Sequence, residues 1–117
     1  VRVVTQPCPG LVECVEAGEL DGPRVRGLLE TYLAPLTAAG ADVIVLGCTH
    51  YPFLRPVIEQ MLGPQVTVLD ANAAVARQTR RILDQFGLQA ASGGGSALEV
   101  LASGESDAIK GFLPLID

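Results

Sequence analysis

Apolar residues in the first third of the chain recur with the period of an α-helix. Over residues 23–39 they follow the i, i+3, i+4, i+7 spacing of an amphipathic helix, which Pro35 should end or kink. A short helical turn is expected over residues 11–17, and a longer helix with one apolar face over residues 71–86. The apolar positions that predict the helix at 23–39 are Val25, Leu28, Leu29, Tyr32, Leu33 and Leu36.

Short aliphatic runs alternate with these helices and are typical of strands. Residues 1–5 are β-branched and predict a strand, while residues 42–47 form a continuous aliphatic run, which predicts a central strand buried on both faces of a parallel sheet. A helix opened by prolines follows over residues 52–62, and residues 66–69 form the next strand. The alternation predicts an α/β fold with right-handed crossovers. Two further elements are predicted nearer the end, a strand over residues 98–102 and a helix over residues 105–116.

The composition argues against several kinds of partner. The 117 residues suffice for one domain, and the hydrophobic share of 49% is mostly aliphatic. A net charge of −5 with a pI near 4.7 leaves no broad basic field, so we expect no nucleic-acid ligand. No apolar run approaches the roughly 20 residues that span a bilayer, so we expect no membrane association.

The cysteines and the start of the chain suggest where the protein works. Cys8, Cys14 and Cys48 are too few, and odd in number, for a disulfide framework, which fits a reducing cytoplasm. We also expect no secretory leader, because no basic stretch followed by apolar and small residues is seen at the start of the sequence. It begins at Val1 rather than Met, and a predicted strand starts at once, so we interpret the sequence as a fragment of a longer protein.

The chemistry is expected in the segment that follows the strand at residues 42–47. Ligands of parallel sheets bind beyond the carboxyl ends of the strands, and Gly47 should let the chain turn there. The amino end of the following helix favours anions, so it would favour both a substrate carboxylate and a thiolate at Cys48. Thr49 and His50 would donate hydrogen bonds to the substrate, and His50 could also act as a general acid.

Plainer interpretations apply to the other reactive residues. A cysteine at a strand end is more often a small buried hydrophobe than a catalyst, and we assign that structural role to Cys8 and Cys14. A Cys₃His zinc site built from Cys8, Cys14, Cys48 and His50 is disfavoured because the spacing lacks the short chelating pairs of structural zinc sites. We therefore expect no metal. The glycine-rich stretch at 92–96 lacks the spacing of a phosphate-binding loop and is expected to be a plain loop.

The segment Leu46-Gly47-Cys48-Thr49-His50-Tyr51-Pro52 resembles the second cysteine motif of bacterial glutamate racemases. Upstream, Cys8-Pro9 and the Val-Glu-Ala-Gly segment at 15–18 resemble a further family segment. Downstream, the Val-Leu-Asp segment at 68–70 and the Ala-Val-Ala segment at 74–76 also resemble segments of this family. The resemblance covers nearly the whole chain, but only the carboxyl-terminal portion of a family member.

The resemblance implies a parallel-sheet α/β fold of two pseudo-symmetric domains, with the active site in the cleft between them. Residues 1–70 would belong to the second domain, and residues 71–117 would return to the first. Family enzymes need no cofactor, because one thiolate removes the Cα proton of glutamate and a second thiol returns one on the opposite face. The first catalytic cysteine of the family, followed by Asn-Thr, and the family's Asp-Ser motif have no counterpart here. The fragment by itself is expected to be inactive.

By the same resemblance, Cys48 is one of the two catalytic thiols. Thr49 and His50 contact the substrate glutamate, and Glu16 is an auxiliary acidic residue of the site. The family role is the supply of D-glutamate for peptidoglycan, and a homodimer of the full-length protein remains open. Two alternatives also remain open: an aspartate or hydantoin racemase of the same superfamily, and a non-catalytic fragment that binds a protein partner.

Overall fold

The computed structural model describes residues 1–90, 99–101 and 111. They belong to two compact units, Val1–Asp70 and Ala71–Asp117. The first unit contains α1 (Leu11–Glu16), α2 (Pro23–Ala38), β1 (Val43–Val45), the 3₁₀ helix η1 (Tyr51–Leu54), α3 (Arg55–Leu62) and β2 (Thr67–Leu69). The second contains α4 (Asn72–Phe86).

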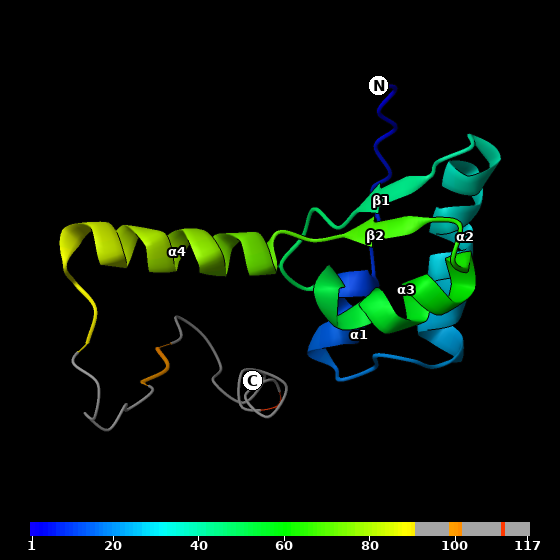
Figure 1. Ribbon diagram of the computed structural model, residues 1–117. Coiled ribbons are helices and arrows are strands. Elements are labelled where there is room, and N and C mark those ends of the chain that lie inside the picture. Colours follow the sequence, from blue (N-terminus) through cyan, green and yellow to red (C-terminus); the bar gives the residue numbers. More distant parts are fainter. Residues whose placement is uncertain (91–98, 102–110, 112–117) are drawn as a thin grey trace. The chain divides into compact units, whose positions relative to one another are not determined.

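The described strands β1 and β2 form a parallel pair joined through η1 and α3. Val43 pairs with Thr67, Ile44 with Val68 and Val45 with Leu69, so both strands end at the same edge of the sheet. Figure 1 shows the two strands side by side, with α1, α2 and α3 gathered on one side of them. The predicted parallel α/β arrangement is confirmed for this unit.

The core of the first unit lies between the helices and one face of the sheet. In a strand, alternate side chains point to opposite faces, so the central residues Ile44 and Val68 face the helices at 8% and 2% exposure. Leu46 continues the buried row just beyond β1. The remaining buried apolar side chains come from the three helices and η1: Leu11, Cys14, Val15, Val25, Leu29, Leu33, Leu54, Val57 and Ile58.

The other face of the sheet corrects the prediction of a strand buried on both sides. Val43, Val45 and Leu69 are 44%, 70% and 47% exposed, because no described element of this unit packs over them. β1 is not a central strand either, since the described sheet has two strands. A continuous aliphatic run predicts burial only when a second layer is present to cover it.

A further prediction is wrong within the described residues. Residues 1–5 form no strand, and Val1 and Val3 are exposed, because β-branched residues favour an extended chain but a strand also needs a hydrogen-bonded neighbour. The helix predicted at 23–39, which Pro35 should end or kink, runs from Pro23 to Ala38, so Pro35 does not end it. The proline costs one backbone hydrogen bond, and the burial of Val25, Leu29 and Leu33 along the helix outweighs that loss.

The second unit is described mainly by α4, which confirms the helix predicted at 71–86 and is capped by Gly87 in a left-handed conformation. None of its side chains is buried, and its apolar residues Val75 and Phe86 are 60% and 65% exposed. Residues 99–101 form no strand. The rest of the strand predicted at 98–102, the loop at 92–96 and all but Gly111 of the helix predicted at 105–116 lie outside the described residues.

Candidate active site

The Gly-Cys-Thr-His segment lies where the sequence predicts it, just beyond the carboxyl end of β1. Leu46 extends the ladder by donating its N–H to the carbonyl of Leu69 at 2.8 Å. Cys48, Thr49 and His50 then follow, and η1 begins at Tyr51. The segment is therefore held between a buried strand and a helical turn, at the edge where both parallel strands end.

Cys48 is half-buried and lies beside the imidazole ring of His50. The Cys48 Sγ atom is 3.8 Å from His50 Nδ1. The Oγ1 atom of Thr49, an exposed residue, is 3.4 Å from the same nitrogen. Thiol and hydroxyl thus lie near the same ring nitrogen.

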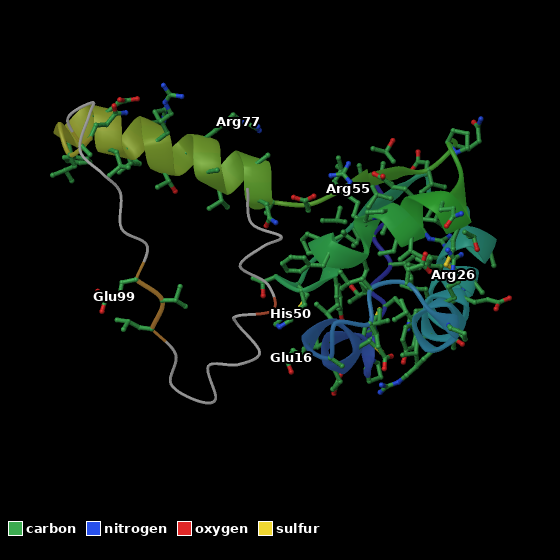
Figure 2. The ribbon with its side chains drawn as sticks, turned by 90° about the horizontal axis from the view of Figure 1, so that it is seen from below. Glu16, Arg26, His50, Arg55, Arg77 and Glu99 are labelled. Atoms are coloured by element: carbon green, nitrogen blue, oxygen red, sulfur yellow. The ribbon has the colours of Figure 1, made fainter. Side chains whose placement is uncertain are left out.

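The other ring nitrogen of His50 faces an acidic residue from a different element. His50 Nε2 is 3.3 Å from Glu16 Oε1, at the end of α1, and the side chains are 31% and 52% exposed. Figure 2 shows the two residues close together, with Glu16 reaching from α1. The fold therefore brings together all four residues that the sequence proposes: Cys48, Thr49, His50 and Glu16.

This geometry forms a chain from thiol to imidazole to carboxylate. When the proton of the neutral ring is on Nε2, that nitrogen donates to Glu16 and leaves Nδ1 as an acceptor toward the Cys48 thiol. Transfer of the thiol proton to Nδ1 then gives a thiolate beside an imidazolium, and the Glu16 carboxylate stabilises the positive ring. The arrangement can thus generate a thiolate that acts as a base or nucleophile.

Tyr51 is a neighbour of the site that the sequence interpretation does not single out. Its hydroxyl donates to the backbone carbonyl of Cys8 at 3.4 Å. Burial raises the pKa of the Tyr51 phenol, and the nearby Cys8 and Cys48 thiols raise it further. The residue next to His50 was visible in the sequence, but its contact with a residue 43 positions away was not.

The other two cysteines occupy different environments. Cys14 is fully buried in the core, as its structural interpretation predicts. Cys8 is half-buried, and its thiol donates to the carbonyl of Gln6 at 3.3 Å. Burial raises the pKa of the Cys8 thiol, and a hydrogen bond with Tyr51 partly opposes that rise. Cys8 therefore lies near the site with its thiol directed to a backbone carbonyl.

Within the described part of the chain, no three or more His, Cys, Asp or Glu residues are placed to hold a metal ion. The alternative zinc set of Cys8, Cys14, Cys48 and His50 is accordingly not assembled. The chain bends directly after Gly47, as expected, but Gly47 meets no steric or conformational requirement for glycine in the described structure. Its φ is not positive, and an added Cβ would meet no atom within 4 Å.

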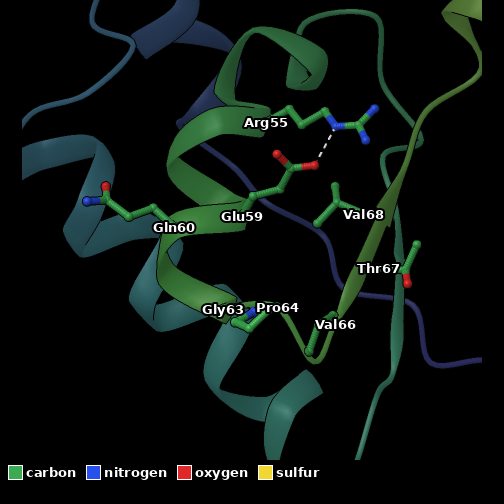
Figure 3. A pocket seen from close by; sticks show the side chains of 8 residues that line it. All are labelled: Arg55, Glu59, Gln60, Gly63, Pro64, Val66, Thr67 and Val68. Atoms are coloured by element: carbon green, nitrogen blue, oxygen red, sulfur yellow. Dashed lines mark hydrogen bonds and ion pairs between the residues drawn. The ribbon is translucent and has the colours of Figure 1, made fainter.

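A hollow on the first unit lies away from these residues. It has a volume of about 570 Å³ and lies between α3 and β2, where Figure 3 shows its lining. None of Cys48, Thr49, His50 and Glu16 lines it. The candidate site is therefore not part of this hollow.

Comparison with known proteins defines the class. Residues 2–79 match the model of the family described as Asp/Glu/Hydantoin racemase, and the chain belongs to this family. Its similar curated relatives are named glutamate racemases. The one from Pseudomonas entomophila is 49% identical over 116 residues, which are 99% of this chain and 43% of the relative. The one from Herpetosiphon aurantiacus is 53% identical over 105 residues, 90% of this chain and 41% of the relative.

Solved structures of glutamate racemases also match this chain. Glutamate racemase from Thermus thermophilus, in complex with β-chloro-D-alanine, matches with a TM-score of 0.67 and 35% identity, over 78% of this chain and 35% of that one. The enzyme from Francisella tularensis, in complex with D-glutamate, matches with a TM-score of 0.66 and 25% identity, over 76% and 33%. The resemblance to glutamate racemases and the racemase-like fold are confirmed. The chain spans less than half the length of these relatives.

No helix among the described residues is long and apolar enough to cross a membrane.

Proposed function

We propose that this chain supplies one of the two catalytic thiols, Cys48, of a glutamate racemase. The observation that carries the proposal is the contact chain from Cys48 Sγ through His50 to Glu16, at 3.8 Å and 3.3 Å, at the carboxyl edge of the sheet. The names of the relatives and the D-glutamate bound to the Francisella enzyme support glutamate as the substrate.

In the proposed reaction the Cys48 thiolate takes the α-proton from one face of glutamate. The Cα–H bond breaks, an S–H bond forms, and the electron pair stays on Cα, where the substrate's own carboxylate helps to delocalise it. A second thiol, from the part of the enzyme outside this chain, delivers a proton to the opposite face and leaves as a thiolate. Substrate and product differ only in configuration, so the reaction balances without a cofactor.

The neighbouring residues have separate roles in this proposal. His50, held by Glu16, accepts or returns the proton of the Cys48 thiol between turnovers. Thr49 is exposed beside the ring and donates a hydrogen bond to glutamate, as does His50 when its ring is turned to the substrate. The product D-glutamate would serve peptidoglycan synthesis in the cytoplasm.

We further propose that residues 1–70 form part of one racemase domain and residues 71–117 the segment that returns to the other. The division of the chain into compact units after Asp70 supports this assignment. A catalytic cleft with walls from both domains would then need the remainder of the enzyme, and residues 1–117 by themselves would not turn over glutamate.

An aspartate or hydantoin racemase is the second candidate, because the matched family model includes these activities in its description. A panel of glutamate, aspartate and hydantoin substrates, given to the full-length enzyme, separates the candidates. Turnover of glutamate well above the other substrates is expected. A preference for aspartate or hydantoins would overturn the glutamate assignment.

Replacing the thiol tests the proposal directly. In the full-length enzyme, Cys48→Ala should abolish racemisation of both enantiomers, since each turnover needs one thiol to take a proton and one to give it. Any residual loss of α-deuterium, followed by NMR, should favour the one enantiomer whose Cα–H faces the remaining thiol. Cys8→Ala is the matched control, and it should keep the activity. Racemisation by Cys48→Ala, or by residues 1–117 without the rest of the enzyme, would refute the two-thiol assignment.

A further inference from the structure

The segment that carries Cys48, residues 46–55, is attached at its two ends to the last residue of β2 and to the residue after it. At its start, the Leu46 N–H donates to the carbonyl of Leu69, the last residue of β2, at 2.8 Å. At its end, Arg55 Nη1 donates to Asp70 Oδ2 at 2.8 Å. Leu69 and Asp70 are consecutive, so two adjacent residues hold the two ends of the segment that contains Cys48, Thr49 and His50.

The Arg55 side chain has two arms, the hydrogen bond from its Nε atom and the hydrogen bond from its Nη1 atom, and they connect different elements. Its Nε donates to Glu59 Oε1 at 2.7 Å, one turn further along the same helix, and the Glu59 side chain is 46% exposed (Figure 3). Its Nη1 reaches Asp70, which is 15 residues away along the chain and has a side chain only 11% exposed. The Glu59 arm is local to α3, whereas the Asp70 arm joins the start of α3 to the end of a neighbouring strand.

Both carboxylates raise the pKa of Arg55, Glu59 more than Asp70, so the guanidinium stays charged across the whole working range of pH. A planar guanidinium can hold two carboxylates in fixed directions at once, which an ammonium group does less well. The arrangement is therefore suited to fixing a backbone position, and α3 follows the active-site loop directly after η1.

We propose that Arg55 and Asp70 are positioning residues of the racemase, and that their ion pair sets where Cys48 lies relative to the substrate Cα. This inference rests on the proposed function. Proton transfer between carbon and sulfur depends steeply on the placement of the thiolate, and a displacement of about 1 Å can reduce a rate about a hundredfold. Neither residue touches the reacting atoms in this role.

The test compares variants of the full-length enzyme in steady-state racemisation. Arg55→Met removes both arms, and Glu59→Gln, the matched control, weakens only the local arm. We expect Arg55→Met to lower kcat roughly tenfold to a hundredfold with KM changed less than threefold, because loop placement affects the transition state more than binding. Glu59→Gln should stay within twofold of the wild type, and Arg55→Lys should recover part of the loss.

A double variant shows whether Arg55 acts through Asp70. Arg55→Met/Asp70→Asn should be no slower than the slower single variant, since two changes in one interaction do not add. Active sites are counted as the molecules whose fully buried Cys14 stays unlabelled by iodoacetamide, so that a smaller folded fraction is not mistaken for a lower kcat. This count separates a positioning role from a merely structural one.

Two results would overturn the inference and leave the proposed function standing. One is a loss of activity in Arg55→Met that disappears when rates are expressed per active site. The other is an equal loss in Glu59→Gln. Activity that survives Cys48→Ala would instead remove the proposed function on which the inference depends.

Discussion

The contact between Glu16 and His50 permits a quantitative prediction about how much the carboxylate contributes. Two unit charges 3.3 Å apart attract each other by about 1.3 kcal/mol in bulk water. The side chains are 31% and 52% exposed, and exposed ion pairs contribute roughly 0.2–1 kcal/mol in double-mutant cycles. If Glu16 acts by stabilising the protonated ring of His50, its removal should slow racemisation by at most about fivefold.

The assay is a double-mutant cycle in the full-length enzyme, with Glu16→Gln, His50→Asn and the double variant compared by kcat/KM. His50→Asn should cause the larger loss, and adding Glu16→Gln to it should change little, because the carboxylate then has no ring to stabilise. Glu13→Gln is the matched control. It lies on the same helix, is exposed, and has no described contact with His50.

The dependence of the rate on ionic strength tests the same electrostatic attraction independently. Raising the ionic strength from 0.1 M to 1 M shortens the screening length from about 10 Å to about 3 Å. The difference between wild type and Glu16→Gln should shrink accordingly. A coupling above about 2 kcal/mol, roughly thirtyfold in rate, would refute the electrostatic reasoning and assign Glu16 a direct part in proton transfer. An equal loss in Glu13→Gln would refute it too.

Three shorter predictions concern the packing of this chain. Leu54→Ala should lower the free energy of unfolding by about 2–5 kcal/mol in urea titrations because Leu54 is fully buried, whereas Val45→Thr, on the exposed sheet face, should change it by less than about 0.5 kcal/mol. Equal effects would contradict the one-sided sheet. Cys14, which has no exposed surface, should resist iodoacetamide until urea unfolds the chain, as mass spectrometry of the peptide can show. Its early labelling would contradict the core. Stability should fall as pH rises through the range where unfolded thiols ionise, because burial raises the pKa of Cys8 and favours the protonated folded form. Cys8→Ala should weaken that fall, and an unchanged pH profile would refute the assignment.

Local sequence patterns were sufficient for most elements of the first unit. The periodic apolar residues of α2, the prolines at the start of η1 and α3, and the glycine after α3 each act over one or two turns of chain, so they predict these elements without knowledge of their partners. The four site residues also came from the sequence, through the motif around Cys48 and its resemblance to a family. The pattern predicted which residues would carry chemistry, and the parallel sheet predicted the edge on which they lie.

Tertiary structure decided whatever depends on contacts between distant segments. The exposed face of β1, the missing strand at residues 1–5 and the continuation of α2 past Pro35 all depend on which neighbours are present, and a sequence pattern cannot supply a neighbour. The same holds for the contacts that define the site. Glu16 meets His50 across 34 positions of sequence and Arg55 meets Asp70 across 15, because packing of α1 against η1 and pairing of β1 with β2 bring these side chains together.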